Sequence, residues 1–353
     1  MNAMAHSALQ PGAFIPAMPL ALNSSRRFDQ RRQQALIRYY AASGVDGLAV
    51  GVHTTQFEIR EPRFDLFKPV LALAAEALDR ADRDRGAPLI RIAGVCGNTQ
   101  QAVAEATLAR ECGYHAGLLS LVALRDASED ELISHCRTIS QVIPLIGFHL
   151  QAAVGGGPLP YSFWRRFAEI ENVVAIKIAP FNRYQTLDVV RAIADSGRSN
   201  IALYTGNDDH IVLDLITPFE FMSATGQPIR RQFVGGLLGH WAVWTQPAVK
   251  LFRRCRELAT AYAPVPSDLL AIANAITDCN AAFFDAANNY RGCIPGIHEV
   301  LRRQGLYEGI WCLDENLALS PGQSAEIDRV YAAYPSLQDD EFIATHLDSW
   351  LSE

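Results

Sequence analysis

Short apolar runs recur along the first two thirds of the chain. Eight of them have the length of a β-strand, are rich in Val, Ile, Leu and Gly, and do not alternate with polar residues. Runs of this kind are typical of parallel strands that are buried on both faces of a sheet. We therefore expect strands over residues 14–20, 46–52, 88–95, 116–122, 143–150, 173–179, 201–206 and 233–239.

Between most of these runs, apolar residues recur at the spacing of an amphipathic helix. Three helical stretches begin at a residue type that caps helices, namely Asp29, Thr99 and Ser128. From the third predicted strand to the seventh, the repeat is roughly 28 residues, the length of one βα unit. Eight strands in about 240 residues indicate an α/β protein with a (β/α)8 TIM barrel fold. The clearest helical stretches cover residues 29–43, 99–112, 128–141 and 184–196.

The pattern changes after residue 239, where helical stretches continue without apolar runs between them. The last stretch, residues 321–353, has a break at residues 336–339. We expect two units, a barrel over residues 1–245 and a C-terminal helical region over residues 246–353 that packs on the barrel. The earlier helical stretches of this region cover residues 244–262, 266–289 and 297–305.

Composition argues against several classes of partner. Among 353 residues, 31 are basic and 38 acidic, so the formal net charge is −7 and a basic nucleic-acid-binding surface is not expected. No apolar run approaches the roughly 18 residues that span a bilayer, and residues 1–11 lack the pattern of a signal peptide. The seven cysteines are scattered and form no CxxC pair, which is typical of reduced thiols. We expect a cytoplasmic protein that binds neither nucleic acid nor a membrane.

Lysine is rare in this chain, and one lysine has an unusual position. Only Lys68, Lys177 and Lys250 occur, and Lys177 alone lies inside an apolar predicted strand. Apolar surroundings disfavour the ammonium form and lower the pKa of a lysine below about 10.4. A neutral amine attacks carbonyl groups and forms a Schiff base. The alternative is a lysine whose stem packs in the core while its ammonium group reaches solvent or a carboxylate.

Two threonines follow the second predicted strand, at the end where TIM barrels carry their reactive groups. The hydroxyls of Thr54 and Thr55 could bind a carboxylate or relay a proton. They could equally cap the next helix.

Other polar residues at strand ends give weaker signals. Asp208 and Asp209 follow the seventh predicted strand and can be turn residues. Four histidines could meet at a metal ion, but they come from separate strands and show no HxH or ExxH pairing, so we expect no metal. These histidines are His53, His149, His210 and His240.

Five segments within residues 13–334 resemble, in order and spacing, the dihydrodipicolinate synthase / N-acetylneuraminate lyase family of Schiff-base-forming barrels. They are GVDGLAVGVHTT (44–55), VVAIKIAP (173–180), LYTGNDD (203–209), FVGGLLG (233–239) and CIPGIHEVLRRQGL (293–306). The resemblance implies that Lys177 is the Schiff-base lysine and that Thr54 and Thr55 form the family's Thr-Thr motif. Related barrels are commonly dimers or tetramers, so the resemblance also implies a homo-oligomer. The substrate-binding positions that it implies are Phe148, Gly206, Asn207, Gly235 and Gly236.

The chain departs from this family where acid–base and carboxylate-binding groups are expected. On the fifth strand the family reads Tyr-Asn-x-Pro, followed by a Gly-Arg-Thr loop. The Tyr shuttles protons and the Arg holds a substrate carboxylate. Here Phe148 stands at the Tyr position, His149 at the Asn position, and about Ala153 at the Arg position. Residues 122–125, Val-Ala-Leu-Arg, replace a Pro-Tyr-Tyr stretch after the fourth strand. Synthesis of dihydrodipicolinate is therefore not expected.

These observations predict a Schiff-base-forming lyase, an aldolase or a dehydratase, that acts on a 2-oxo acid or another small carbonyl compound without a cofactor. His149, Thr54 or a water molecule would replace the missing Tyr. An imidazole with a pKa of about 6.5 suits this role, but neighbouring strand residues point to opposite faces, so His149 can instead be structural. Two other functions stay open. One is a barrel that binds a metabolite or partner without turnover, and the other is a metal-dependent barrel that uses the strand-end histidines.

Overall fold

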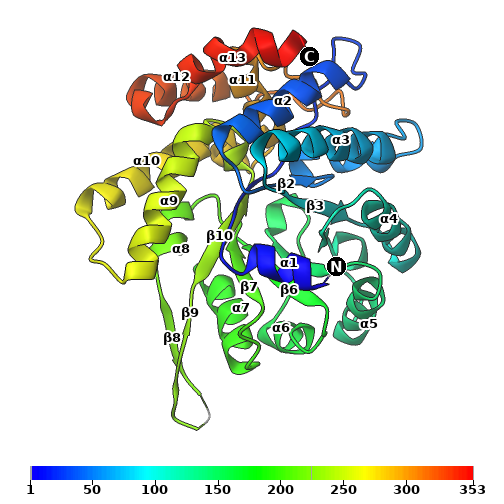
Figure 1. The fold of residues 1–353 in the computed structure, drawn as a ribbon, viewed down its shortest axis with the longest axis vertical. Helices are drawn as coiled ribbons and strands as arrows, with labels where there is room; N and C mark the ends of the chain where they lie inside the picture. Colours follow the sequence, from blue (N-terminus) through cyan, green and yellow to red (C-terminus); the bar gives the residue numbers. More distant parts are fainter. Residues whose placement is uncertain (1, 224, 353) are drawn as a thin grey trace.

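Eight parallel strands form a closed barrel in the computed structural model, which describes residues 2–223 and 225–352 (Figure 1). The strands are hydrogen-bonded in the order β1-β10-β7-β6-β5-β4-β3-β2, and a bridge between Ala17 and Ala49 closes the ring. The predicted (β/α)8 barrel is confirmed, and each of the eight apolar runs contains one of its strands. They are β1 (Phe14–Pro16), β2 (Gly47–Val50), β3 (Ile90–Val95), β4 (Ala116–Leu119), β5 (Leu145–Leu150), β6 (Val173–Ala179), β7 (Ala202–Thr205) and β10 (Phe233–Leu238).

A helix follows each barrel strand on the outside (Figure 1). The side chain of Asp29 caps the first of these helices, and Ser128 forms a reciprocal capping box with Glu131 at α5. The cap of α4 is Asn98 and not the predicted Thr99, which is the first helical residue. The helices are α2 (Gln30–Ser43), α3 (Phe67–Arg85), α4 (Thr99–Glu111), α5 (Glu129–Ser140), α6 (Tyr161–Phe167), α7 (Arg183–Asp195), α8 (Ile211–Ile216) and α9 (Thr245–Ala261).

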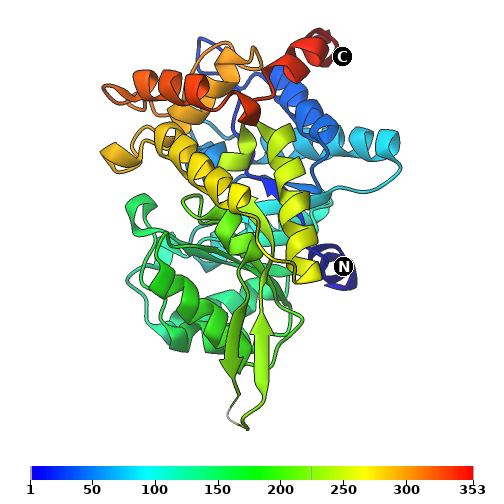
Figure 2. The ribbon, with the colours of Figure 1, turned by 90° about the vertical axis from the view of Figure 1, so that its left-hand side faces the viewer.

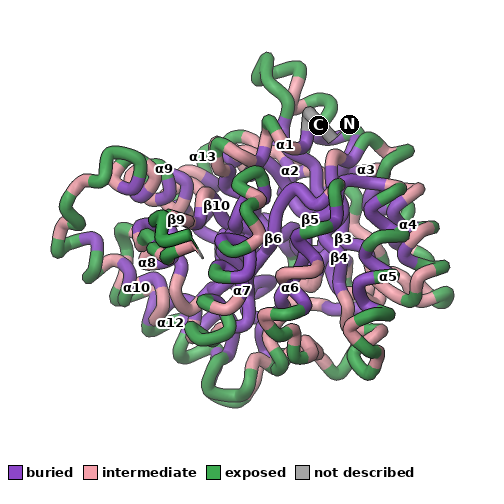
Figure 3. The backbone as a smooth tube through the Cα atoms, turned by 90° about the horizontal axis from the view of Figure 1, so that it is seen from below, coloured by how far each residue is buried: buried purple, intermediate pink, exposed green. Residues whose placement is uncertain are grey.

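The apolar core has two layers, one between strands and helices and one inside the barrel. Figure 3 shows the buried strands surrounded by helices whose outer sides are exposed. A short helix, α1 (Asn2–Leu9), packs against the inner layer, and the Tyr204 hydroxyl donates to the carbonyl of Leu9 at 2.8 Å. The sequence pattern does not predict this helix, because its 8 residues are too few to show a helical repeat. The helix covers the amino end of the barrel and leaves the carboxyl end for a site.

A two-stranded hairpin interrupts the barrel repeat between α8 and β10. Its strands, β8 (Phe219–Met222) and β9 (Pro228–Arg231), are antiparallel and project away from the barrel (Figure 2). The sequence analysis predicts no strand here, because each strand has only 4 residues and lacks a continuous apolar run.

Four more helices follow α9, as the helical pattern predicts. They are α10 (Ser267–Phe283), α11 (Cys293–Arg303), α12 (Gln323–Ala333) and α13 (Asp340–Ser352), and a short turn at Pro335–Leu337 forms the expected break. The prediction of a helix up to residue 289 is wrong, since α10 ends at Phe283. Asp285, Asn289 and Tyr290 adopt left-handed backbone angles that a helix cannot contain. Within the described residues, no helix combines the length and the apolar character needed to cross a membrane.

Candidate active site

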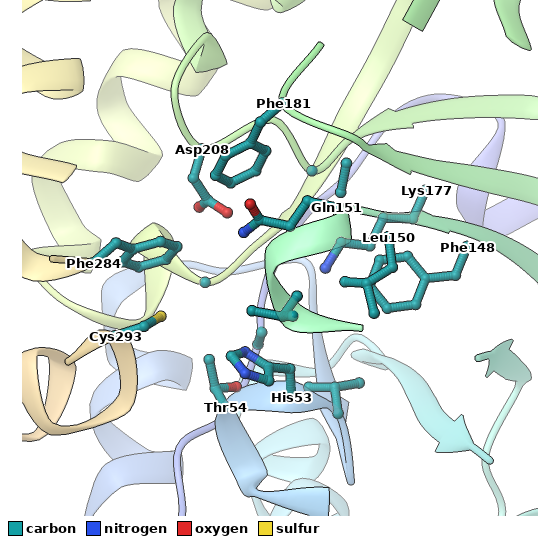
Figure 4. Close-up of a pocket in the computed structure, with 16 residues that line it drawn as sticks. His53, Thr54, Phe148, Leu150, Gln151, Lys177, Phe181, Asp208, Phe284 and Cys293 are labelled. Carbon is teal, nitrogen blue, oxygen red and sulfur yellow. The ribbon is translucent and has the colours of Figure 1, made fainter. Parts of the chain in front are cut away.

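A small cavity opens at the carboxyl end of the barrel (Figure 4). Its volume is about 50 Å³, which is enough for a few water molecules or a small organic compound. Its walls come from β5 and β6, from the turns that follow β2 and β7, and from the C-terminal helical region. The lining residues are Ala17, Val52, His53, Thr54, Phe148, Leu150, Gln151, Val154, Lys177, Ala179, Phe181, Gly206, Asp208, Gly239, Phe284 and Cys293.

Lys177 lies on β6, and its side chain reaches into this cavity. The residue pairs in register with Phe148 of β5, and its Nζ lies 4.6 Å from the centre of the Phe148 ring. Lys177 is only 8% exposed. Burial lowers the pKa of Lys177, and the nearby Asp208 carboxylate offsets part of that shift. A larger share of neutral amine is therefore present near neutral pH than for an amine in water. The other two lysines, Lys68 and Lys250, are exposed.

Gly206 provides the space for this lysine. A Cβ at Gly206 would lie 2.6 Å from Cε of Lys177 and 2.8 Å from Cβ of Ala179. Any larger residue at this position would displace the Lys177 side chain.

The two threonines have different surroundings. The hydroxyls of Thr54 and Thr55 both donate to the carbonyl of Met18, at 3.2 and 2.6 Å. Thr55 also accepts a hydrogen bond from the backbone N–H of Gly51 at 3.0 Å and does not line the cavity, so it ties together two barrel turns. Thr54 does line the cavity, and its hydroxyl keeps acceptor capacity for a ligand.

Asp208 is the main group at this site that the sequence analysis treats only as a turn residue. It follows β7, is 5% exposed, and accepts a hydrogen bond from the backbone N–H of His240 at 2.8 Å. Its carboxylate lies across the cavity from Lys177, and the carboxamide of Gln151 points into the space between them (Figure 4). Burial raises the pKa of Asp208, whereas the Lys177 ammonium opposes that shift.

Several other residues that line the cavity are not among the predicted site residues. Phe284 and Cys293 come from the C-terminal helical region, and Phe181 comes from the turn after β6 with a left-handed φ of 52°. His53, one of the strand-end histidines, is half-buried there, and burial together with Lys177 lowers its pKa to about 4. Phe284 and Cys293 lie far along the chain from Lys177, so no local sequence pattern places them at this cavity.

His149 is not brought to the cavity. Phe148 lines the cavity, and the next residue along β5 faces outward, as strand alternation requires. The His149 ring packs 5.5 Å from the ring of Trp164 on α6, and its Nδ1 has no hydrogen-bond partner among the described residues. Burial lowers the pKa of His149 to about 4. The geometry therefore disagrees with a proton-transfer role at Lys177 and favours the structural alternative.

Asn207 is a second predicted site residue that lies behind the cavity wall. Its side chain accepts from the backbone N–H of Phe181 at 3.1 Å and donates to Thr186 at 3.2 Å and to Asp214 at 2.9 Å. Asn207 can position Phe181 but does not reach a ligand.

Gly235 and Gly236 also lie outside the cavity lining. A Cβ at Gly235 would lie 2.4 Å from the backbone oxygen of Ala13, and one at Gly236 would lie 2.6 Å from the ring of Trp241. Both glycines allow β10 to pack closely, so the structure gives them a packing role.

The strand-end histidines have separate environments. His149 packs on α6, His240 stacks on Phe283 at 5.8 Å, and His53 lines the cavity. Among the residues that the structure describes, no group of three His, Cys, Asp or Glu side chains could hold a metal ion. The chemistry that the cavity itself offers is a buried amine opposite a buried carboxyl group. Such an amine is suited to attack a carbonyl carbon.

Comparison with known proteins agrees with this architecture. The model of the dihydrodipicolinate synthetase family matches residues 10–218. A 4-hydroxy-tetrahydrodipicolinate synthase from Bifidobacterium longum (strain DJO10A) is 26% identical over 219 residues, and the match spans 61% of this chain and 65% of that relative's length.

Solved structures share the fold over nearly the whole chain. The dihydrodipicolinate synthase from Oceanobacillus iheyensis superimposes with a TM-score of 0.73 at 15% identity, over 95% of this chain and 100% of that one. The 4-hydroxy-tetrahydrodipicolinate synthase from Methylacidiphilum fumariolicum SolV gives a TM-score of 0.73 at 16% identity, over 92% and 96% of the two chains. The family match over more than half of the chain, together with this shared fold, shows that the chain belongs to the dihydrodipicolinate synthetase family.

Proposed function

We propose that the protein is a Schiff-base-forming lyase, an aldolase or a dehydratase, that acts on a 2-oxo acid or another small carbonyl compound. The observation that carries this proposal is the burial of the Lys177 amine in a small cavity at the carboxyl end of the barrel. In the first step the neutral Nζ attacks the carbonyl carbon. The new C–N bond then becomes a C=N bond as the carbonyl oxygen leaves as water.

The cavity argues against the reaction named for the relatives. Phe148, which stands where the resemblance places a proton-shuttling tyrosine, lines the cavity and has no exchangeable proton. Ala153 stands near the position of the family's carboxylate-binding arginine and is exposed on the loop after β5. The cavity lining within the described residues contains no arginine. These features support a different acid–base group and a substrate that is not held by an arginine.

Borohydride trapping tests the proposal. Wild-type protein is incubated with pyruvate and with a panel of other 2-oxo acids and aldehydes, then reduced and digested, and the modified lysine is located by mass spectrometry. We expect one adduct on Lys177 and none on Lys68 or Lys250, because those two side chains are exposed and lie outside the cavity lining. Lys250→Arg should keep the adduct and Lys177→Arg should lose it. No adduct with any compound, or one on Lys250, contradicts the proposal. An adduct without turnover of any compound would instead support a binding protein.

A further inference from the structure

Asp208 has no assigned role in the steps above, yet it is a buried carboxyl group inside the reacting cavity. A buried carboxylate is costly unless partners compensate it. Its Oδ1 accepts from the backbone N–H of His240 at 2.8 Å, and the backbone amide of Gly239 also favours the ionised form. Among the described residues that line the cavity, it is the only acid. A carboxyl group held in this way has a fixed orientation toward the bound compound.

The electrostatic surroundings of Asp208 allow it to exchange a proton. Burial raises the pKa of Asp208 and lowers that of Lys177, while each charged form stabilises the other. The other ionisable groups that act on Asp208 or feel its charge are Asp209, Tyr290 and Cys293. The pKa values of Tyr290 and Cys293 are raised, so both groups are neutral near pH 7. Lys177 is thus the cation that faces Asp208, and its charge changes during the reaction.

Asp208 is better placed to accept a proton from the substrate than from Lys177. Asp208 lies on the opposite side of the cavity from Lys177 (Figure 4). A compound bound through its carbonyl carbon to Nζ would extend from Lys177 toward this carboxylate. A hydroxyl on the second carbon from the imine would then be the polar group nearest to Asp208.

The other polar groups are less suited to this transfer. His149 lies outside the cavity, and Phe148 carries no exchangeable proton. The Thr54 hydroxyl already donates to the carbonyl of Met18 at 3.2 Å. His53 has a pKa of about 4, so it is a weaker base than a carboxylate whose pKa is raised by burial.

We propose, on the basis of the Schiff-base function above, that Asp208 is the catalytic base for the hydroxyl of a β-hydroxy carbonyl substrate, which includes 4-hydroxy-2-oxo acids. In cleavage, Asp208 takes the hydroxyl proton and the oxygen lone pair forms an aldehyde C=O bond. The adjacent carbon–carbon bond breaks, and its electron pair forms the enamine and neutralises the iminium nitrogen. The enamine carbon then takes a proton, and water hydrolyses the imine to free Lys177 and the second carbonyl product.

The test compares Asp208→Asn with Asp209→Asn, which removes the same charge one residue away and outside the cavity lining. The probes are 4-hydroxy-2-oxobutanoate and 4-hydroxy-2-oxopentanoate, and aldehyde release is followed over a pH series. We expect Asp208→Asn to lower kcat by about 10²-fold or more, the usual size of an acid–base contribution. Trapping of pyruvate on Lys177 should persist in this variant, and Asp209→Asn should stay within about fivefold of wild type.

The pH dependence separates a chemical role of Asp208 from a structural one. The reaction needs the carboxylate, so wild-type kcat should fall as the pH drops through the raised pKa of Asp208. This limb belongs to the imine complex, where Lys177 no longer titrates as an amine, and it should be absent from Asp208→Asn. If the Asn variant does not fold, Asp208→Ser is measured in its place.

Two results overturn this proposal while Lys177 still traps pyruvate. One is an unchanged kcat and pH profile in the folded Asp208 variant, and the other is failure of the wild-type protein to cleave either probe. Absence of any trapped adduct would instead refute the Schiff-base function itself.

Discussion

Replacing Gly206 by alanine tests whether Lys177 needs the free space beside Gly206 to keep its amine in a reactive position. The new Cβ would lie 2.6 Å from Cε and 3.0 Å from Cγ of Lys177, which is closer than carbon atoms pack. The φ of Gly206 lies outside the left-handed region, so alanine causes no backbone strain there. Movement of the flexible lysine side chain can relieve these contacts, but Cβ of Ala179, which would lie 2.8 Å from the new Cβ, moves only with the β6 backbone.

The expected effects on stability and on reactivity differ in size. Overpacking a core usually costs about 1–3 kcal/mol, and the contact with Ala179 places Gly206→Ala in the middle of that range. A shift of a reacting group by ~1 Å can slow a reaction by about 10²-fold. We therefore expect the rate of borohydride-trapped adduct formation with pyruvate to fall by about that factor, while urea unfolding shows a loss of about 2 kcal/mol.

Gly235→Ala is the matched control, because it also crowds a barrel strand but lies outside the cavity lining. Its Cβ would lie 2.4 Å from the oxygen and 2.6 Å from the nitrogen of the Ala13 backbone, which cannot move aside easily. We expect about 3 kcal/mol of destabilisation and an unchanged adduct rate per folded molecule. A wild-type adduct rate in Gly206→Ala would refute the reasoning, since the amine would then not depend on this space.

Two further predictions concern buried ionisable groups away from the cavity. His149→Phe should leave the adduct rate unchanged and reduce the loss of stability on acidification. Burial lowers the pKa of His149 from 6.5 to about 4, so its contribution to stability is complete above pH 6.5 and is lost as the pH falls toward 4. That contribution is at most about 3 kcal/mol, and urea unfolding at pH 7 and pH 4.5 measures it; identical pH dependence in both proteins contradicts the prediction. Glu105→Ala should destabilise the protein by about 3–5 kcal/mol in thermal or urea unfolding, because it leaves Arg60, now 3.0 Å from Glu105, buried without its partner. A loss below about 1 kcal/mol would show that the pair is effectively solvated.

The sequence predicts the barrel strands well because each is buried on both faces and therefore appears as a continuous apolar run. The same property makes Lys177 recognisable in the sequence, because a strand that is buried on both faces has no solvated side for a lysine. The elements that escape prediction are α1 and the β8–β9 hairpin, which are short. Their positions are decided by contacts with the barrel and not by a local repeat, as the bond from Tyr204 to Leu9 illustrates.

Among the site residues, those on neighbouring strands can be predicted from the sequence, whereas those brought in by distant segments cannot. Gly206 and Phe148 lie beside Lys177 because neighbouring strands place them there, and strand order can be inferred from the sequence. To predict whether His149 faces the cavity, one must know which face of β5 points into the barrel. A shift of one residue in strand register turns every side chain to the opposite face. Phe284 and Cys293 close the cavity from a helical region more than a hundred residues after Lys177 along the chain. Contacts of that kind depend on how the helices pack and leave no local pattern.

The charges in the cavity restrict which carbonyl compounds fit the site. Its described lining holds one amine, Lys177, and one carboxyl group, Asp208, and no guanidinium group. When the amine becomes an iminium ion, its positive charge lies opposite the Asp208 carboxylate until the enamine forms and Asp208 takes the hydroxyl proton. A carboxylate at the far end of a compound bound to Lys177 would face Asp208 in a small buried cavity, where like charges repel strongly. Compounds whose second polar group is a hydroxyl avoid this repulsion and give Asp208 a proton to accept, so under the function proposed above we expect them to react in preference to dicarboxylates.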